Sequence, residues 1–407
     1  MSLEGALAVL AHSRSDLEDV VRALCQLATL SHFLGHFNQR DDSVEAAAEL
    51  LAGPPVGEDA GTPSVAELDP SCGTVGEGRI GGGSGRDLPM RRLAALLVFG
   101  TVGLGGGQPA RAWDDFGHML VAAGAYDNLT PPVRKKVDAL VKLNPQYSTW
   151  VQGVAAKDKG KVAFMMAARW PDWIKLKGSG HVSDGPDGGN RPPDDPSASQ
   201  NVGYSDTAMH KYWHFIDEPF VPPGDSTSPQ PPPSVNAQSE IALLRAALKS
   251  AKTKQKLKSY DLVWLEHIVG DVHQPLHCTS RFDVADKSGD SGGNSVLLAK
   301  GSGYTATELH ALWDDFPGTS EDPTAAIAAQ TTLPAPDKDQ AAIADEAKWI
   351  DESFQAAKKA AYAAPIGIGD GTFTLDAPYL TAGRELSAVR ISLGAARLAN
   401  LLNDALN

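Results

Sequence analysis

The chain has 407 residues, of which 42% are hydrophobic and 21% are charged, and its formal net charge is −14. This acidic balance argues against a basic nucleic-acid-binding surface, but it does not exclude a phosphodiester substrate, because bound cations make a single site locally positive. No apolar run reaches the roughly 18–20 residues that span a membrane, so we expect no stable membrane association.

A segment typical of a secretory signal peptide occupies residues 90–112. Two arginines precede the apolar run Leu93–Leu104, and Ala110-Arg111-Ala112 has the small-residue pattern of a cleavage site. Cleavage after Ala112 would leave Trp113 as the first residue of a periplasmic or secreted protein. We therefore treat residues 113–407 as the functional domain.

Residues 1–89 precede this signal and are interpreted as a mis-annotated or disordered leader, with translation starting at Met90. The alternative is a genuine additional segment, in which Asp16–Leu34 could form a helix. Gly53–Gly85 is rich in Gly, Pro and Asp, a composition typical of disorder. Downstream of the cleavage site the only cysteine is Cys278, which excludes an intramolecular disulfide there.

The functional domain is predicted to be mainly α-helical, a single compact multi-helix domain with long irregular loops. Apolar residues recur with a helical period in six segments, and Thr130 followed by prolines is a helix start signal. No region shows several alternating strands in succession. The expected helices are Pro131–Leu143, Gly160–Lys175, Ser239–Val272, Glu308–Asp315, Asp339–Ala361 and Leu380–Leu402.

Two segments interrupt this pattern, Gly178–Ser205 and Pro222–Val235. The first is rich in Gly, Pro and Asp, and the second contains three consecutive prolines, which favour extended backbone. Both flank the segment that holds His214. They are interpreted either as the rim of a substrate groove or as solvated surface insertions.

Two His-x-x-x-Asp pairs carry the strongest chemical signal. His267 and Asp271 form one pair, and His310 and Asp314 form the other. Residues at positions i and i+4 share one face of a helix. One such pair is usually structural, but two pairs in apolar sequence, where charge is costly, indicate a shared cation.

Further candidate ligands lie among apolar residues elsewhere. Asp172 follows Trp170-Pro171, His214 follows Trp213, and a turn after the first pair brings His277 back toward it. Singly, Asp172 could be a helix-end carboxylate and His214 a core histidine. The freed amine and carbonyl oxygen of Trp113 can chelate a metal, and His118 follows five residues later.

Taken in order, these motifs resemble the trinuclear-zinc, single-strand-specific nuclease and 3′-nucleotidase family, typified by the fungal nucleases S-one and P-one. That family lies within the zinc-dependent phospholipase C superfamily, and its fold is implied here. The resemblance covers nearly all of residues 113–407 and none of residues 1–112. The matching elements are Trp113 with His118, Trp170 with Asp172, His214–Asp217, His267–His277, Gly292–Asn294 and Leu309–Asp314.

The resemblance implies three zinc ions. Each ligand set combines nitrogen and oxygen donors, which suit zinc, and one aspartate belongs to two sets. Carried over position by position, the sets are Asp172, His214, His267 and Asp271 for the first ion, Trp113, His118 and Asp271 for the second, and His277, His310 and Asp314 for the third.

The activity implied is hydrolysis of single-stranded DNA and RNA to 5′-phosphorylated products, together with 3′-nucleotidase activity on nucleoside 3′-monophosphates. A hydroxide shared by the first two zinc ions would attack phosphorus, and the third ion would stabilise the leaving 3′-oxygen. As a catalytic residue, Asp271 would act through the two zinc ions that it would bridge. Lys175 stands where the family usually has arginine and would add positive charge without the bidentate fork. The alternative for Lys175 is a solvated side chain at a helix end.

The resemblance also implies a binding site for the nucleobase. Phe215 would stack on the base, Asp217 would hydrogen-bond its edge, and Asn294 would lie near the metals. A base can be stacked in this way only when it is free of its duplex, which would explain a preference for single strands. The alternatives are a core role for Phe215, a capping role for Asp217 and a structural role for Asn294.

Two departures from the family pattern, three histidines without an assigned role and two rival functions remain. The absence of disulfides suggests a bacterial member of the family, expected to be a monomer. Asp114-Asp115 replaces a Gly-containing pair and would either tighten metal binding or alter access. His181, His210 and His273 match no ligand position and are left as surface or supporting groups. The rivals are a zinc phospholipase C and a non-catalytic metal-binding or nucleic-acid-binding protein.

Overall fold

The computed structural model describes residues 113–369 and 371–407. The chain divides into two units, residues 1–103 and 104–407, and every described residue belongs to the second unit. The predicted helix at Asp16–Leu34, the predicted disorder at Gly53–Gly85 and the predicted signal peptide at 90–112 lie outside the described residues.

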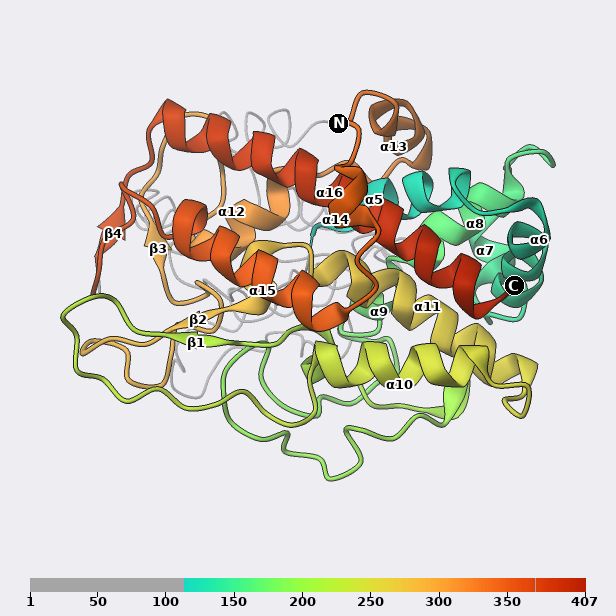
Figure 1. Cartoon of the computed structure of the whole chain (residues 1–407), viewed down its shortest axis with the longest axis horizontal. Helices are drawn as coiled ribbons and strands as arrows, with labels where there is room; N and C mark the ends of the chain where they lie inside the picture. Colours follow the sequence, from blue (N-terminus) through green and yellow to red (C-terminus); the bar gives the residue numbers. More distant parts are fainter. Residues whose placement is uncertain (1–112, 370) are drawn as a thin grey trace, which may run out of the picture. The chain divides into compact units, whose positions relative to one another are not determined.

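The described part of the chain is mainly α-helical, as predicted (Figure 1). Four two-residue strands form two parallel pairs, β1 with β2 and β3 with β4. The strands are Pro219–Phe220, Ser280–Arg281, Leu297–Leu298 and Thr372–Phe373. The α-helices are α5 Asp115–Asp127, α6 Pro131–Val141, α7 Tyr147–Trp150, α8 Lys159–Ala167, α9 Trp170–Trp173, α10 Ala237–Lys249, α11 Gln255–Asp271, α12 Leu309–Asp315, α13 Pro323–Gln330, α14 Lys338–Ala341, α15 Glu346–Ala356 and α16 Ala377–Ala405.

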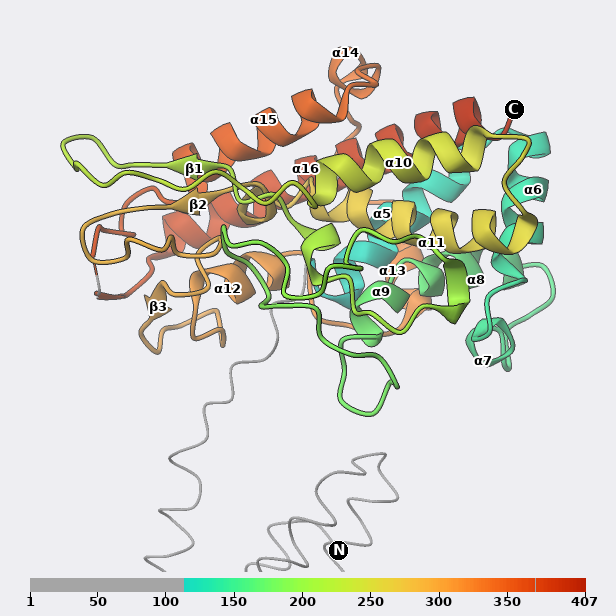
Figure 2. The ribbon, with the colours of Figure 1, turned by 90° about the horizontal axis from the view of Figure 1, so that it is seen from below.

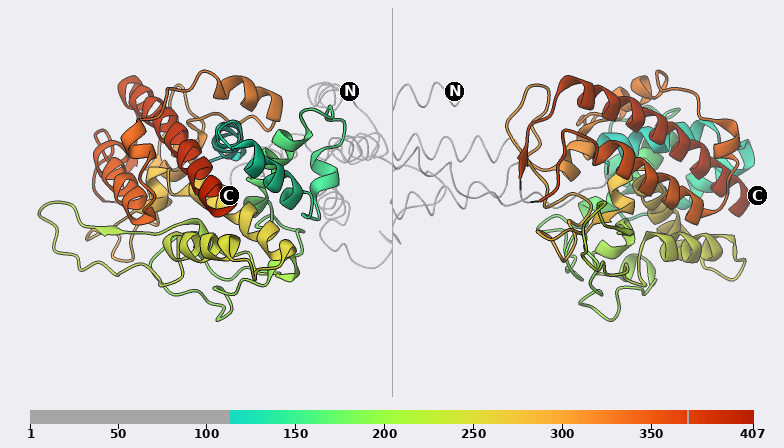
Figure 3. Two further views of the ribbon diagram at one scale, coloured as in Figure 1. Left: turned by 45° about the vertical axis from the view of Figure 1, so that its right-hand side comes forward. Right: turned by 60° about the vertical axis from the view of Figure 1, so that its left-hand side comes forward.

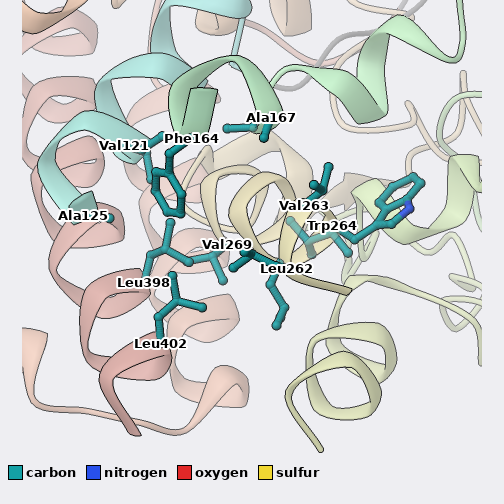
Figure 4. Close-up of a cluster of buried hydrophobic side chains, with 14 of the residues drawn as sticks. Val121, Ala125, Phe164, Ala167, Leu262, Val263, Trp264, Val269, Leu398 and Leu402 are labelled. Carbon is teal, nitrogen blue, oxygen red and sulfur yellow. The ribbon is translucent and has the colours of Figure 1, made fainter. Parts of the chain in front are cut away.

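Helix α11 forms the centre of the core. Every residue from Ser259 to Asp271 is buried, so this helix has no solvent-facing side over its second half. It contacts α5, α6, α10 and α16. Figure 4 shows side chains of α5, α8, α11 and α16 meeting in one cluster, among them Phe164, Val269 and Leu398. A helix that is buried all round holds its polar residues in fixed positions.

The loop at residues 178–205 and the C-terminal helix lie on different sides of this domain. In Figure 2, α15 and α16 run along one side, and the irregular segment around residues 178–205 lies on the other. Figure 3 shows the domain in two further views. The segment 178–205 contains only one short 3₁₀ turn, η2 Gly203–Ser205, so its prediction as irregular structure is confirmed. No helix among the described residues has both the length and the apolarity needed to cross a bilayer.

The prediction of one long helix at Ser239–Val272 was wrong, because the structure has two helices there. Helix α10 ends at Lys249, and the backbone of Ser250 is extended, with φ −69° and ψ 127°. Helix α11 begins at Gln255 after an extended Lys254. The intervening residues are mostly polar and offer no apolar face to the core, so the chain can turn and pack α10 against α11.

Two other predicted helices are also divided. The segment Gly160–Lys175 becomes α8 and α9, because Pro171 lies in the first turn of α9 and has no N–H to continue the ladder. In the segment Asp339–Ala361, Asp345 starts α15 anew by accepting a hydrogen bond from the Ala347 N–H, and the last turn, η5 Ala357–Ala361, is a π-helix. Each break has a local signal in the sequence, Pro171 for the first and the N-cap Asp345 for the second.

Besides the four-residue helix α7, two helices were not predicted, α5 and α13. Helix α5 follows Asp114, and α13 follows Asp322, whose side chain accepts a hydrogen bond from Thr324 N–H. Both are rich in Ala and apolar residues, so they show little amphipathic period. Their N-cap aspartates were the available signals.

Glu266 is an unusual member of the buried helix α11. Its side chain is fully buried, and neither carboxyl oxygen accepts a hydrogen bond from the described residues. Burial therefore raises the pKa of Glu266 well above its usual range. The folded protein holds this side chain as a neutral acid over a pH range in which the unfolded chain, with a pKa of about 4.3, would have lost the proton.

This difference makes stability depend on pH in a defined direction. Folding takes up a proton at Glu266, so the free energy of unfolding falls as pH rises from the unfolded pKa toward the raised folded pKa. We expect Glu266→Gln, which cannot ionise, to gain stability relative to wild type between about pH 5 and about pH 8. Urea midpoints over this range measure the gain. Glu385→Gln, on the exposed side of α16, controls for the loss of one carboxyl group. If the difference in unfolding free energy between wild type and Glu266→Gln does not change with pH, Glu266 is ionised in the folded protein.

Candidate metal centre

The candidate ligands lie on separate elements that meet at the C-terminal end of α11. His267 and Asp271 belong to α11, and His277 to the following 3₁₀ turn, η4 Pro275–Cys278. Another 3₁₀ turn, η3 Lys211–His214, ends at the fourth ligand. Helices α5, α9 and α12 contribute His118, Asp172, and the pair His310 and Asp314, respectively. Three groups of these side chains have donor atoms close enough to hold a metal ion.

The first donor set comprises Asp172, His214, His267 and Asp271. The two imidazole nitrogens, His214 Nδ1 and His267 Nε2, are 2.8 Å apart. Each lies 3.2–3.3 Å from Asp271 Oδ2 and 3.7–3.8 Å from Asp172 Oδ1. Four donors around zinc at about 2.0–2.1 Å would be separated by about 3.3 Å in a tetrahedron. The set therefore fits a four-coordinate cation.

The second donor set lies on the other side of Asp271. Its Oδ1 atom is 3.3 Å from His118 Nε2, whereas its Oδ2 atom faces the first set. The rings of His118 and His267 stack with centroids 3.9 Å apart. One carboxylate thus presents one oxygen to each set, as a ligand that bridges two cations would.

The third donor set comprises His277, His310 and Asp314. The Nε2 atoms of the two histidines are 3.1 Å apart, and His310 Nε2 is 3.6 Å from Asp314 Oδ2. The other oxygen of Asp314 accepts a hydrogen bond from Gln274 Nε2 at 2.7 Å. That contact fixes the carboxylate so that one oxygen remains directed at the histidines.

Three of the histidines are oriented by backbone carbonyls. The Nδ1 atoms of His267, His277 and His310 lie 2.6–2.8 Å from the carbonyl oxygens of Ala168, His214 and Gly292. Because a carbonyl can only accept, each Nδ1 must carry the proton, and each Nε2 is left with a lone pair. Metal-binding histidines are typically held in this way.

The protonation of the buried side chains also favours a cation. Burial is the largest cause that lowers the pKa of each candidate histidine, and it lowers that of His310 to about 4, so the imidazoles are neutral donors. Burial, with repulsion from Asp172, raises the pKa of Asp271 well above its usual range. Both oxygens of Asp271 are buried and accept no hydrogen bond from the described residues. Coordination to a cation would satisfy them.

Trp113 lies at this centre through its side chain. The indole is fully buried, and its Nε1–H donates to the Gly270 carbonyl at 3.0 Å. A Cβ added at Gly270 would lie 3.0 Å from His118 Nδ1, so the His118 ring stands close over this glycine. The backbone N–H of Asp114 donates to the Asp314 carbonyl at 3.2 Å. The start of the described chain is therefore attached to α11 and α12, beside the second and third donor sets.

The Asp114-Asp115 pair has two separate structural roles. Asp114 is the N-cap of α5. Asp115 is buried and forms an ion pair with Arg169, which also stacks over Trp173. This pair joins the helix that carries His118 to the turn that carries Asp172. The side chain of Asp115 is thus used in packing and is not directed into solvent near the site.

A pocket next to the donor sets contains the predicted substrate-binding residues. Lys175 is buried, with its Nζ 2.7 Å from Asp172 Oδ1, so it is not a solvated helix-end lysine. Burial lowers its pKa, but attraction to Asp172 and Asp187 outweighs burial, and the net shift is upward. Phe215, Asp217 and Asn294 also line the pocket.

The loop at residues 178–205 closes one wall of this pocket. Asp217 accepts a hydrogen bond from the Gly189 backbone N–H, and Asn190 Nδ2 donates to the Asp217 carbonyl. Phe215 is 6% exposed and packs against Tyr212. Asn294 Nδ2 donates to the Ser291 carbonyl. Of the two interpretations of this loop, the groove rim agrees with its contacts.

The remaining histidines lie outside the donor sets, and two of them are not surface groups. His210 is buried between Asp206 and the Ala198 carbonyl, and it stacks on Trp213. His273 is fully buried, and its Nε2 accepts a hydrogen bond from Arg397. Of the two alternatives for these histidines, their burial excludes the surface position and agrees with a supporting role. His181 is half-buried near Trp170.

Sequence reasoning missed several residues that support the site. Arg169 was not singled out, and Gln274 was noted only as part of the His267–His277 motif, without a role. Gly292 stood out in the sequence only as part of a motif. It has φ +67°, and a Cβ there would lie 2.4 Å from the Leu276 carbonyl oxygen and 3.1 Å from His310 Nδ1. Only glycine fits between these two groups.

Comparison with known proteins identifies one family. The family model described as S1/P1 nuclease matches residues 113–407, which include all of the candidate ligands. No curated protein matches the chain.

We expect Gly292→Ala to weaken the third donor set selectively. The added methyl group must displace the Leu276 carbonyl or the His310 ring, and so it disturbs the hydrogen bond that orients His310. Metal analysis of the purified variant should show about one ion fewer per chain than wild type. Gly153→Ala is the matched control, because Gly153 also has a positive φ, +74°, but a Cβ added there would meet no described atom within 4 Å. Equal metal content in both variants would contradict the assigned role of Gly292.

Proposed function

Because the chain belongs to the S1/P1 nuclease family, a zinc-dependent family that hydrolyses phosphodiester bonds, we propose that it is a secreted endonuclease acting on single-stranded DNA and RNA. Its products would be 5′-phosphorylated fragments, and it would also remove phosphate from nucleoside 3′-monophosphates. The observation that carries this proposal is Asp271, whose Oδ1 faces His118 and whose Oδ2 faces His214 and His267.

The proposed metals are three zinc ions, one for each donor set. Asp172, His214, His267 and Asp271 would hold the first, and His277, His310 and Asp314 the third. His118, Asp271 and the amine and carbonyl oxygen of Trp113 would hold the second. Support for a role of Trp113 comes from its buried indole, which fixes this residue beside His118. Zinc bound in such sets lowers the pKa of water from about 15.7 to about 7 and offsets negative charge on phosphate.

Residues of the chain would add charge and orientation. Asp271 would belong to the first and second donor sets and would keep their two ions a fixed distance apart. Lys175 is buried beside Asp172, and its pKa is raised. It therefore keeps a positive charge at the wall of the pocket that faces the donor sets. Negative charge grows at phosphorus during in-line attack, so a fixed cation there stabilises the transition state more than the ground state.

Phe215 and Asp217 would bind the nucleobase. Phe215 offers an aromatic face at the pocket wall, and base stacking contributes about 1–3 kcal/mol per base. Burial raises the pKa of Asp217 to about 8, so at neutral pH the carboxyl group is mostly protonated and can donate as well as accept a hydrogen bond. A flipped-out base edge presents both kinds of partner. Asn294 lies beside this position and would complete the wall.

Two rival functions are less well supported. A phospholipase C for choline lipids would need aromatic side chains around the quaternary ammonium group. Phe215 is the single phenylalanine, tyrosine or tryptophan among the described residues that line the pocket. A non-catalytic protein would have no use for a carboxylate that serves two donor sets. A nuclease would release nucleotides from single-stranded DNA in a reaction that a chelator stops, and it would not hydrolyse phosphatidylcholine. A phospholipase C would hydrolyse phosphatidylcholine, and a non-catalytic protein would hydrolyse neither substrate.

We expect Asp271→Asn to lose metal from the first two sets and to lower kcat/KM on single-stranded DNA by about 10³-fold or more. An amide supplies one neutral oxygen where two charged oxygens are needed. Zinc content and kinetics are measured on the same preparation. Asp261→Asn is the matched control, because Asp261 is a buried aspartate on the same helix outside the donor sets. Unchanged zinc content in Asp271→Asn would refute the proposed bridge.

We expect N-terminal sequencing of the secreted protein to return Trp113 first. An added alanine before Trp113 would keep the indole in place but remove the free amine from the proposed chelate. This extended protein should bind about two zinc ions instead of three, with unchanged thermal stability of the metal-free form. Three ions in the extended protein would exclude the amine as a ligand.

A further inference from the structure

A second lysine lines the pocket beside the donor sets. Lys211 is the first residue of η3, and His214 is its last. Residues three apart in a 3₁₀ helix lie on the same face, so Lys211 and the candidate ligand His214 share one face of this turn. Both side chains line the same pocket as Phe215.

Lys211 is held by a residue from the long loop. Its Nζ lies 2.9 Å from Asp187 Oδ2, and Asp187 also lines the pocket. The two side chains are 14% and 18% exposed, whereas those of Lys175 and Asp172 are 2% and 1% exposed. Both lysines line the pocket, and each has an aspartate partner: Lys175 and Asp172 form an inner pair at the donor sets, and Lys211 and Asp187 form an outer pair nearer solvent.

We propose that Lys211 binds the phosphate that neighbours the scissile one in a polynucleotide, and that Asp187 occupies this lysine when no substrate is bound. The inference rests on the proposed nuclease function. The inner pair touches a donor set, so the inner lysine serves the scissile phosphate. The nucleoside whose base lies at Phe215 joins that phosphate to the next one through its sugar, and the outer pair lines the same pocket as Phe215.

The outer pair can exchange partners without leaving the lysine unpaired. It is less buried than the inner pair, and a phosphate oxygen can replace the Asp187 carboxylate as the partner of Lys211. Asp187 belongs to the segment Gly185–Gly189, in which three glycines have positive φ angles. The carboxylate also repels an entering phosphate. Asp187 would therefore reduce affinity for anions until substrate displaces it.

If Lys211 binds the neighbouring phosphate, its substitution should affect an oligonucleotide and not a nucleoside 3′-monophosphate. A nucleoside 3′-monophosphate has only the phosphate that reaches the donor sets, whereas an oligonucleotide also has its neighbour. Lys211→Gln should therefore raise KM for a single-stranded oligonucleotide about tenfold, with kcat changed less than about twofold. KM for a nucleoside 3′-monophosphate should change less than about twofold. Lys211→Arg should restore most of the oligonucleotide affinity.

Two further readouts separate phosphate binding from a packing defect. The slope of log affinity against log salt for a single-stranded oligonucleotide should fall by about 0.7 in Lys211→Gln, as for one lost phosphate contact. Asp187→Asn should lower KM for the oligonucleotide two- to threefold, about the effect expected when an exposed competing charge is removed. Zinc content should match wild type in both variants. Lys177→Gln, an exposed lysine just before the same loop, controls for net charge.

The outcomes distinguish this inference from the proposed function. If wild type hydrolyses both substrates, and Lys211→Gln has unchanged KM for the oligonucleotide or equal losses on both substrates, the assignment of Lys211 is overturned. Loss of zinc in Lys211→Gln would show that the lysine only supports His214, and this also overturns it. If metal-loaded wild type hydrolyses neither substrate, the nuclease proposal itself fails.

Discussion

The structure depends on the burial of aspartates and histidines that cannot satisfy one another. At the end of α11, Asp271 is fully buried, and both of its oxygens accept no hydrogen bond from the described residues. The neighbouring imidazoles are neutral because burial lowers their pKa values, so they cannot neutralise the carboxylates. Protonation relieves part of this conflict, because burial raises the pKa of Asp271, and a cation between these donors would satisfy the oxygens that remain without partners.

The scaffold around α11 serves this requirement through polar contacts as well as the apolar core. Backbone carbonyls orient three imidazoles, and the Asp115–Arg169 ion pair links two ligand-bearing elements. On the opposite side, Arg397 donates two hydrogen bonds of 2.7 Å to the Glu352 carboxylate and one to His273, just beyond the end of α11. Helices α15 and α16 therefore help to fix the position of the last turn of α11.

Much of the helical content could be predicted from the sequence, but not where helices break. The apolar period of α6, α10 and α15 is visible in the residues. Helix α5 was missed because it is buried nearly all round, and a helix without a polar face gives no periodic signal. The division between α10 and α11 depends on how two apolar faces pack together, which a local pattern does not contain.

The sequence by itself determined which atoms are available for chemistry. The spacing of His267 with Asp271 and of His310 with Asp314 places each pair on one helix face, because the helical repeat requires it. Only the tertiary structure decided that one carboxylate faces two donor sets, that Asp115 is paired with Arg169, and that Asp187 reaches Lys211. These contacts join residues far apart in the chain, and their geometry is set by how helices and loops pack around α11.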